Sequence, residues 1–323
     1  MLKMILRRLL QAIPLLLAVS FITFFLLFHS PGDYLSHLKM NPQISDELLA
    51  REAARLGLDQ PFYVVWWKWL VGIVTRFDFG QSFNFKIPVS ELIGPRLFAT
   101  FLLALTSTIF AWMIGVPLGI MAAVRHNGWT DRLASAIAFL GLSVPSVLLA
   151  LLAVYFAANT NWFPTTGMRS DNAWQMTSTW DRMKDIMYHL ILPTVVLGMG
   201  GLAIYTRQMR SNLLETLNMD YMRTALSKGV SYRMAVMKHA LRNAINPLIT
   251  LFGFAFADLL SGAVLVENVM AWPGLGRLVV EAYFSKDMFV VAASVLMGTI
   301  MLILGNLVAD ILLALTDPRI KYD

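Results

Sequence analysis

Long apolar runs separated by polar stretches dominate the chain and predict helices rather than strands. A helix that crosses a bilayer needs about 20 mostly apolar residues, because each residue advances 1.5 Å through roughly 30 Å of hydrocarbon. The pattern therefore predicts an all-α polytopic membrane protein with six transmembrane helices, the first of which is too long for the apolar region of a cleaved signal peptide. The six runs are Leu9–Phe28, Phe101–Met121, Leu133–Ala157, Leu190–Tyr205, Leu248–Val266 and Phe289–Leu315.

A further apolar segment, Phe62–Val74, competes as a seventh span. It is shorter than the others, contains Lys68 and carries Trp66, Trp67 and Trp69. Tryptophan favours the headgroup region, and short amphipathic stretches lie in the interface rather than cross it. We therefore expect an interfacial helix here.

The distribution of basic residues supports six spans, because an even number places both termini on the side of the most basic loop. That loop, 207–245, contains seven of the 26 Lys and Arg residues and only two acids, Glu215 and Asp220. Positive charge gathers on the cytoplasmic face, so both termini are predicted to be cytoplasmic, an N-in/C-in topology. Further basic residues expected on the same side are Lys3, Arg7, Arg8, Arg125, Arg132, Arg319 and Lys321.

Composition agrees with a membrane protein. Hydrophobic residues make up 57% of the 323 residues and charged residues only 14%, whereas soluble domains contain about 25% charged residues. The net charge of +6 reflects topology rather than a nucleic-acid partner. The chain has no cysteine, which excludes disulfides, iron–sulfur clusters and thiolate nucleophiles.

The predicted topology divides the chain into three parts. Residues 1–29 form a basic N-terminal segment and the first span, 30–96 an extracytoplasmic segment with amphipathic and interfacial helices, and 97–323 a transmembrane core that contains the cytoplasmic loop 207–245. Within the second part, Ser45 before an acidic first turn and Gly57 after an amphipathic run predict a capped helix.

Catalytic and nucleotide-binding motifs are absent from the sequence. There is no phosphate-binding GxxxxGK[ST] loop, no HExxH and no GxSxG. The five histidines are scattered, which predicts no metal site, and no catalytic residue can be assigned. The chain is therefore predicted not to be an enzyme. Gly115 and Gly119 have the small-xxx-small spacing that lets two helices approach closely, although that spacing is common.

Asp258 lies near the middle of the fifth predicted span, where a charge costs at least about 2.5–3.5 kcal/mol. It is a candidate for lining a translocation path or binding a coupling proton, which would suit a proton-coupled secondary carrier. Alternatively it is a structural residue hydrogen-bonded to a neighbouring helix. A proton relay usually contains several acids in register, which favours the structural role.

The basic loop contains two predicted helices, Met222–Lys228 and Tyr232–Asn243, with Gly229 and Ser231 between them. Pro247 then marks the entry into the fifth span. Two helices joined by a glycine turn are typical of a docking element. The alternative is a solvated basic loop that only fixes topology.

This loop resembles the coupling loop of permease subunits in bacterial binding-protein-dependent ABC importers. The general pattern is Glu-Ala-Ala, three residues, Gly, nine residues and Ile-x-Leu-Pro. This chain departs from it, but its residues are similar to the RTAxxKG…HALRNAxxP variant of the dipeptide/oligopeptide branch. The matching residues are Arg223, Thr224, Ala225, Lys228, Gly229, His239, Ala240, Leu241 and Arg242.

Other fragments of the same branch follow in order along essentially the whole chain. They are Ser30–Asp33, Leu56–Pro61, Asp78–Ser82, Ile114–Gly119, Trp272–Arg277 and Asp317–Tyr322. The resemblance implies that Trp272, Pro273, Gly274, Gly276 and Arg277 form a stiff turn near the outer mouth. The alternative is a plain loop joining two spans.

The resemblance implies a type I ABC importer permease fold in the bacterial inner (plasma) membrane, surrounded by lipid. It also implies a second homologous permease subunit, two cytoplasmic ATP-binding subunits and an extracytoplasmic solute-binding protein. ATP-Mg is expected on the partner subunits, with no cofactor bound by this chain. Di- and oligopeptides are the expected cargo, and nickel complexes, glutathione and oligosaccharides are the alternatives.

Overall fold

The computed structural model describes residues 2–32, 45–57 and 59–316, and among these residues it contains helices, turns and one isolated bridge but no strand. The chain folds as two compact units. Unit 1 comprises Phe101–Trp272 and the C-terminal stretch from Leu304, and unit 2 comprises Leu2–Thr100 and Pro273–Ile303.

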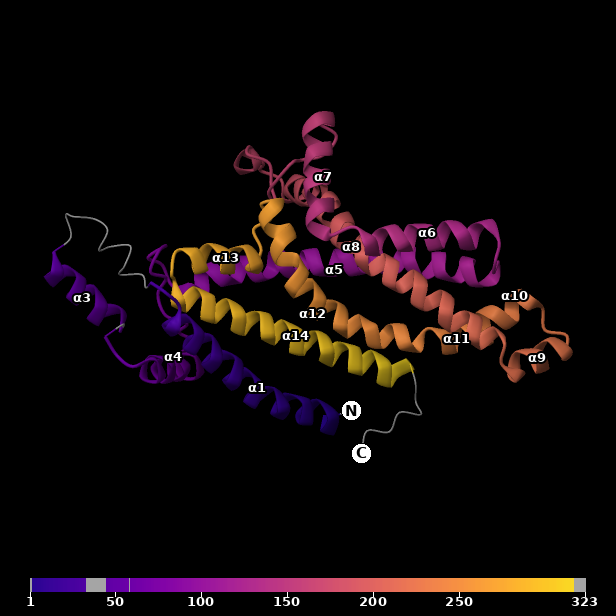
Figure 1. The fold of residues 1–323 in the computed structure, drawn as a ribbon, viewed down its shortest axis with the longest axis horizontal. Helices are drawn as coiled ribbons and strands as arrows, with labels where there is room; N and C mark the ends of the chain where they lie inside the picture. The colour runs from indigo at the N-terminus through magenta and orange to yellow at the C-terminus, as the bar shows by residue number, and fades with distance from the viewer. Residues whose placement is uncertain (1, 33–44, 58, 317–323) are drawn as a thin grey trace. The chain divides into compact units, whose positions relative to one another are not determined.

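Two long helices, α5 (Val89–Val124) and α14 (Met288–Thr316), contribute to both units (Figure 1). Unit 2 otherwise contains α1 (Leu2–His29), α3 (Asp46–Leu56), α4 (Phe62–Arg76) and α13 (Leu275–Phe284). Unit 1 contains α6 (Trp129–Ser143), α7 (Ser146–Thr160), η1 (Ala173–Gln175), α8 (Thr179–Leu217), α9 (Asp220–Ser227), α10 (Tyr232–Ala235), η2 (Val236–Ala240), α11 (Leu241–Ala244) and α12 (Asn246–Val269).

Four helical segments are long and apolar enough to cross a membrane: Met4–His29, Val89–Val124, Thr179–Leu217 and Met288–Ile311. The bent pair formed by α6 and α7 makes a fifth candidate if it is one span. The remaining predicted span falls on α12, part of whose side chains lies outside the described residues. The helical fold is confirmed, and six spans with N-in/C-in orientation stay predictions.

The third predicted span, Leu133–Ala157, is broken in the structure. Helices α6 and α7 meet at 99°. Pro145 has no N–H to donate and disfavours helical geometry in the residue before it, and Val144 is accordingly extended (φ −94°, ψ 120°). The apolar run is continuous, but its backbone turns sharply at this proline.

Unit 2 contains an apolar cluster that includes Phe24, Trp69 and Leu278. A buried carboxylate lies next to this cluster in the chain. Asp287, just before α14, is fully buried and accepts hydrogen bonds from the Ser82 hydroxyl (2.5 Å) and the Asn84 backbone N–H (3.1 Å). A buried charge is tolerated when it is hydrogen-bonded in this way. The Asp287 carboxylate therefore anchors the loop between α4 and α5 to the start of α14.

The predicted caps of α3 are confirmed. The Ser45 hydroxyl accepts a hydrogen bond from the Leu48 N–H (3.3 Å), as an N-cap does, and Gly57 ends the helix in the left-handed region at φ 70°. Helix α4 covers the predicted interfacial segment and, with 15 residues, is shorter than the candidate spans.

In unit 1, α5 and α8 approach so closely that side chains do not fit between them. A Cβ atom on Gly119 would lie 2.6 Å from the Thr206 carbonyl oxygen and 2.7 Å from the Met209 Cβ, and one on Gly115 would lie 2.8 Å from the Leu202 oxygen. The Thr206 hydroxyl also donates to the Gly115 carbonyl (3.2 Å). The close approach predicted from the spacing of these glycines is confirmed.

We predict that Gly119→Ala destabilises unit 1 by about 1–3 kcal/mol, because the added methyl group overpacks the α5–α8 contact. The matched control is Gly200→Ala in α8, where an added Cβ meets nothing within 4 Å. That control should be neutral or stabilising by up to about 1 kcal/mol, since alanine is the better helix former. Thermal unfolding of the purified protein in detergent tests this, and equal melting temperatures for the two variants would contradict it.

Candidate functional site

The candidate site is the connection between α8 and α12, residues 218–245. Helix α8 has 39 residues and spans roughly 58 Å, well beyond the thickness of the hydrocarbon core. The connection folds as α9 followed by the continuous helical stretch α10–η2–α11, at the end of α8 (Figure 1). Both predicted helices and the break between them are confirmed, as is the start of α12 beside Pro247.

Gly229 makes the turn between the two helical parts. Its φ of +82° lies in the left-handed region, its N–H donates to the Leu226 carbonyl (3.0 Å), and the Val230 N–H donates to the Ala225 carbonyl (3.2 Å). These two bonds form a Schellman motif, the usual glycine-dependent helix end. No heavy atom lies within 4 Å of a Cβ added here. Glycine is therefore needed for its backbone conformation and not for space.

A row of alanines packs the connection against α8. Ala235, Ala240 and Ala244 are almost completely buried and pack in one apolar cluster with Met222 of α9 and Leu213 of α8. A spacing of five residues would not keep Ala235 and Ala240 on one face of an ordinary α-helix. The π-helical turn Val236–Ala240 provides that spacing, because π-helices bond residue i to i+5.

Two side-chain amides add polar ties. The Asn212 amide of α8 donates to the Ala244 carbonyl (3.0 Å), and its oxygen accepts from the Gln208 amide (2.8 Å). The Asn243 amide donates to the Tyr221 hydroxyl (3.3 Å), which joins α11 to α9. The connection is therefore held to α8, and its two helical parts to each other, by both apolar and polar contacts.

The predicted coupling residues divide into two groups in the structure. Ala240 is fully buried, and Ala225 and Leu241 are partly buried in the same cluster. His239 is half-buried. The exposed members are Arg223, Thr224, Lys228, Gly229 and Arg242. The Arg223 guanidinium lies 3.7 Å from the Asp220 carboxylate, and with side chains 78% and 97% exposed this ion pair contributes little stability.

The motif missed a set of large apolar side chains that point away from the cluster. Six of them on the connection are between 39% and 55% exposed: Met219, Tyr221, Leu226, Tyr232, Met234 and Met237. They alternate with exposed basic residues Arg223, Lys228, Arg233, Lys238 and Arg242. Grouped exposed apolar side chains mark contact surfaces, and methionine suits adaptable ones. Helical period alone does not separate them from the buried residues, because the exposed Leu226 follows the buried Met222 by one turn.

Two family models together match most of the chain. Residues 115–322 match the family described as binding-protein-dependent transport system inner membrane component, and residues 1–104 match the N-terminal membrane component of such systems. The chain belongs to this family of ABC importer permeases. As a permease subunit it is non-catalytic, and its resemblance to the peptide branch is confirmed.

Several relatives match over their whole length. The permease is 41% identical to the oligopeptide transport system permease protein AppB of Bacillus subtilis, over 98% of this chain and 99% of that protein. It is 40% identical to the glutathione transport system permease protein GsiC of Salmonella typhimurium, over all of both chains, and 38% identical to that of Escherichia coli K12. A solved structure of the inward-facing MetNI methionine ABC transporter shares its fold, with a TM-score of 0.54 at 18% identity over 68% of this chain and 94% of that chain.

The other predicted site residues lie outside the connection. Asp258 is in α12, and its side chain is outside the described residues. In unit 1, Trp272 is fully buried. In unit 2, Gly274 precedes α13, and the Arg277 guanidinium donates to the Glu281 carboxylate one turn later (2.8 Å). The role of 272–277 at an outer mouth stays a prediction.

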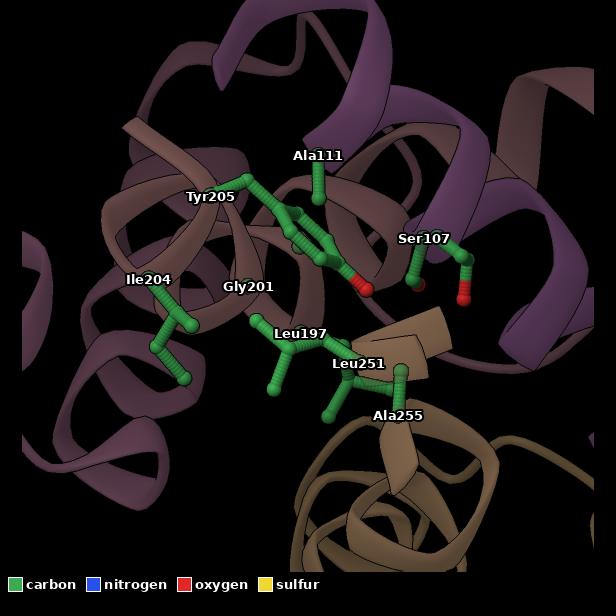
Figure 2. Close-up of a pocket in the computed structure, with 10 residues that line it drawn as sticks. Ser107, Ala111, Leu197, Gly201, Ile204, Tyr205, Leu251 and Ala255 are labelled. Carbon is green, nitrogen blue, oxygen red and sulfur yellow. The ribbon is translucent and has the colours of Figure 1, made fainter. Parts of the chain in front are cut away.

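Within unit 1 of the permease, a cavity of about 280 Å³ lies among α5, α8 and α12. Gly198 and Gly201 of α8 line it, and Leu197, Leu251 and Ala255 make its wall apolar. Figure 2 shows the ring of Tyr205 directed toward Ser107 across this cavity. The buried Ser107 hydroxyl has no hydrogen-bond partner among the described residues. The cavity suits a small, mostly apolar group.

We predict that substitutions of Gly229 rank by their tolerance of a left-handed backbone. Gly229→Asn should be milder than Gly229→Val, because asparagine adopts positive φ more readily than a β-branched residue. The difference should reach about 1–2 kcal/mol. Proteolysis rates of the purified permease at the connection measure it. If both variants behaved alike, the conformational requirement at Gly229 would be refuted.

Proposed function

We propose that this permease forms half of the transmembrane pathway of an ATP-driven peptide importer and that its α8–α12 connection docks on a cytoplasmic ATP-binding subunit. The observation that carries the proposal is that the connection has one face packed on α8 and another face exposed. Its inner face is packed on α8 through buried alanines, and its outer face carries exposed Tyr, Met and basic side chains. A solvated loop that only fixed topology would need neither feature.

The attachment of the connection supports a mechanical role. Because the connection is bonded to α8 and continues directly into α12, a push on its outer face is passed to both helices. Closure of an ATPase pair would then tilt these helices and exchange inward-open and outward-open states. Interfaces of this kind are bistable rather than continuously deformable, which suits such an exchange.

The proposal includes the orientation and the partners expected from the family. Basic residues concentrated around the connection favour its cytoplasmic location, and with six spans both termini would lie on the same side. A second homologous permease subunit would complete the pathway, two ATP-binding subunits would hold ATP-Mg, and an extracytoplasmic binding protein would deliver cargo. The turn at 272–277 would then lie near the outer mouth.

Peptides are the proposed cargo because two relatives bear names that refer to oligopeptide and glutathione transport, and glutathione is itself a small peptide. Nickel complexes and oligosaccharides are the alternatives. Uptake by proteoliposomes that contain the full transporter and each loaded binding protein would distinguish them. Peptide-dependent stimulation of ATP hydrolysis is the expected result. If only nickel complexes or only oligosaccharides stimulated hydrolysis, that class would replace peptides as the proposed cargo.

We predict that Leu226→Glu weakens co-purification of the ATP-binding subunit at least tenfold, because it places a carboxylate on the exposed apolar face without touching the buried one. The matched control is Trp174→Glu on η1, which is also strongly exposed but lies outside the connection. Co-purification of the ATPase from membranes measures both. Normal recovery of the ATPase with Leu226→Glu would contradict docking at this face.

We predict that Asp258→Asn leaves ATP-driven uptake intact, because an ATP-driven importer needs no coupling proton. Uptake is measured in proteoliposomes with internal ATP and, separately, with a pH gradient and no ATP. Uptake driven by the gradient alone and abolished by Asp258→Asn would favour the proton-coupled carrier instead.

A further inference from the structure

A buried ion pair joins the start of α6 to α8. The Arg210 guanidinium donates two hydrogen bonds to the Asp131 carboxylate, from Nε to Oδ1 (2.6 Å) and from Nη2 to Oδ2 (2.9 Å). The Asp131 side chain is only 5% exposed and that of Arg210 29%. Two parallel bonds from a planar guanidinium fix the relative orientation of the two helices as well as their separation.

Asp131 also organises the turn between α5 and α6. Its Oδ2 accepts the Asn127 backbone N–H (2.9 Å), and Asn127 itself has a positive φ of 62°. The His126 ring nitrogen lies 3.3 Å from the same carboxylate oxygen. An acid in the first turn of α6 is favoured by the helix dipole. One carboxylate therefore holds both the turn and α8.

Arg210 lies where α8 contacts three elements at once. Its backbone N is 3.1 Å from the place of a Cβ on Gly119 of α5, which leaves no room between the helices. Two residues later, the Asn212 amide holds the Ala244 carbonyl of the connection. The next residue, Leu213, belongs to the cluster that buries the connection. The ion pair is thus separated from the connection by less than one turn of helix.

Elsewhere α6 meets α8 through small residues. A Cβ on Gly141 would lie 2.9 Å from the Met199 carbonyl and 3.0 Å from the Ala203 Cβ. Such contacts bring helices close but interlock them little, so they allow one helix to slide along the other. The directional bonds of Asp131 and Arg210 are what oppose that sliding. From there α6 leads directly to the 99° bend before α7.

We propose that Asp131 and Arg210 are positioning residues that make the α5–α6 turn move together with the α8–α12 connection. ATP-driven motion of the connection then reaches the bent pair α6–α7 as well as α8 and α12. The inference rests on the proposed function. It adds a second route by which the connection acts on the membrane helices. Neither residue touches cargo or nucleotide in this role; each acts through the helix that it holds.

The test uses the complete transporter in proteoliposomes and measures peptide molecules imported per ATP hydrolysed. Asp131→Asn removes the charge at constant shape, and Arg210→Lys keeps the charge but loses the two-pronged geometry. Each should lower the ratio at least fivefold while the complex still assembles. The matched control, Arg132→Gln, removes a neighbouring exposed charge and should stay within twofold of wild type. Assembled variants with an unchanged ratio would overturn the proposal.

A covalent link separates positioning from folding. Because the chain has no cysteine, Asp131→Cys combined with Arg210→Cys introduces its only two thiols. Joining them with a short bifunctional thiol reagent should restore the import ratio to within twofold of wild type, and the unlinked protein should stay at least fivefold lower. Transport blocked by the link would show that the two segments move apart, and failure of the cysteine variant to assemble would make the pair purely structural. Either result overturns the proposal, whereas a failure of the proposed function would already appear as absent ATP-driven uptake in the wild type.

Discussion

The close approach of α5 and α8 is the constraint on which the rest of unit 1 depends. Apolar side chains gain little from leaving lipid for one another, so membrane helices associate where small residues let backbones meet. Gly115 and Gly119 meet α8 at carbonyl oxygens and at Cβ atoms, with no space for a methyl group. This contact sets the distance between α8 and α5, and the hydrogen bond from the Thr206 hydroxyl to the Gly115 carbonyl adds a directional tie between them. Everything that α8 carries, including the connection to α12, is positioned from that contact.

Helix α8 in turn positions other parts of unit 1, through residues that lie within one turn of each other. Arg210 binds the start of α6, Asn212 holds the end of the connection, and Leu213 joins the cluster around Met222. Because these residues are neighbours on one rigid helix, the partners they hold are coupled in position even though their sequences are far apart. A coupling argument needs an element with two discrete arrangements, and in the proposed function these are the inward-open and outward-open states of the membrane helices.

Local signals made much of the fold predictable. The Ser45 and Gly57 caps, the turn at Gly229 and the start of α12 beside Pro247 depend on residues that lie next to one another in sequence. The bend at Pro145 was missed, because the apolar run Leu133–Ala157 predicts one continuous span, although proline disrupts a helix whatever the apolarity of the run. The pairing of Asp131 with Arg210 was not predictable, because it joins positions 79 residues apart with no common period. Nor was the π turn, which depends on packing rather than propensity.

The site shows why a motif and a contact surface are different sets of residues. Of the residues that match the importer pattern, Gly229 supplies a backbone conformation and Ala240 a close contact with the cluster that includes α8. Both are demands of the fold, and both would be met whatever the partner. Exposed side chains that could meet a partner, such as Leu226 and Met237, lie between the motif positions. In the proposed function, the pattern thus identifies the element that would dock, and the choice among ATPase partners would rest with exposed residues that the pattern leaves open.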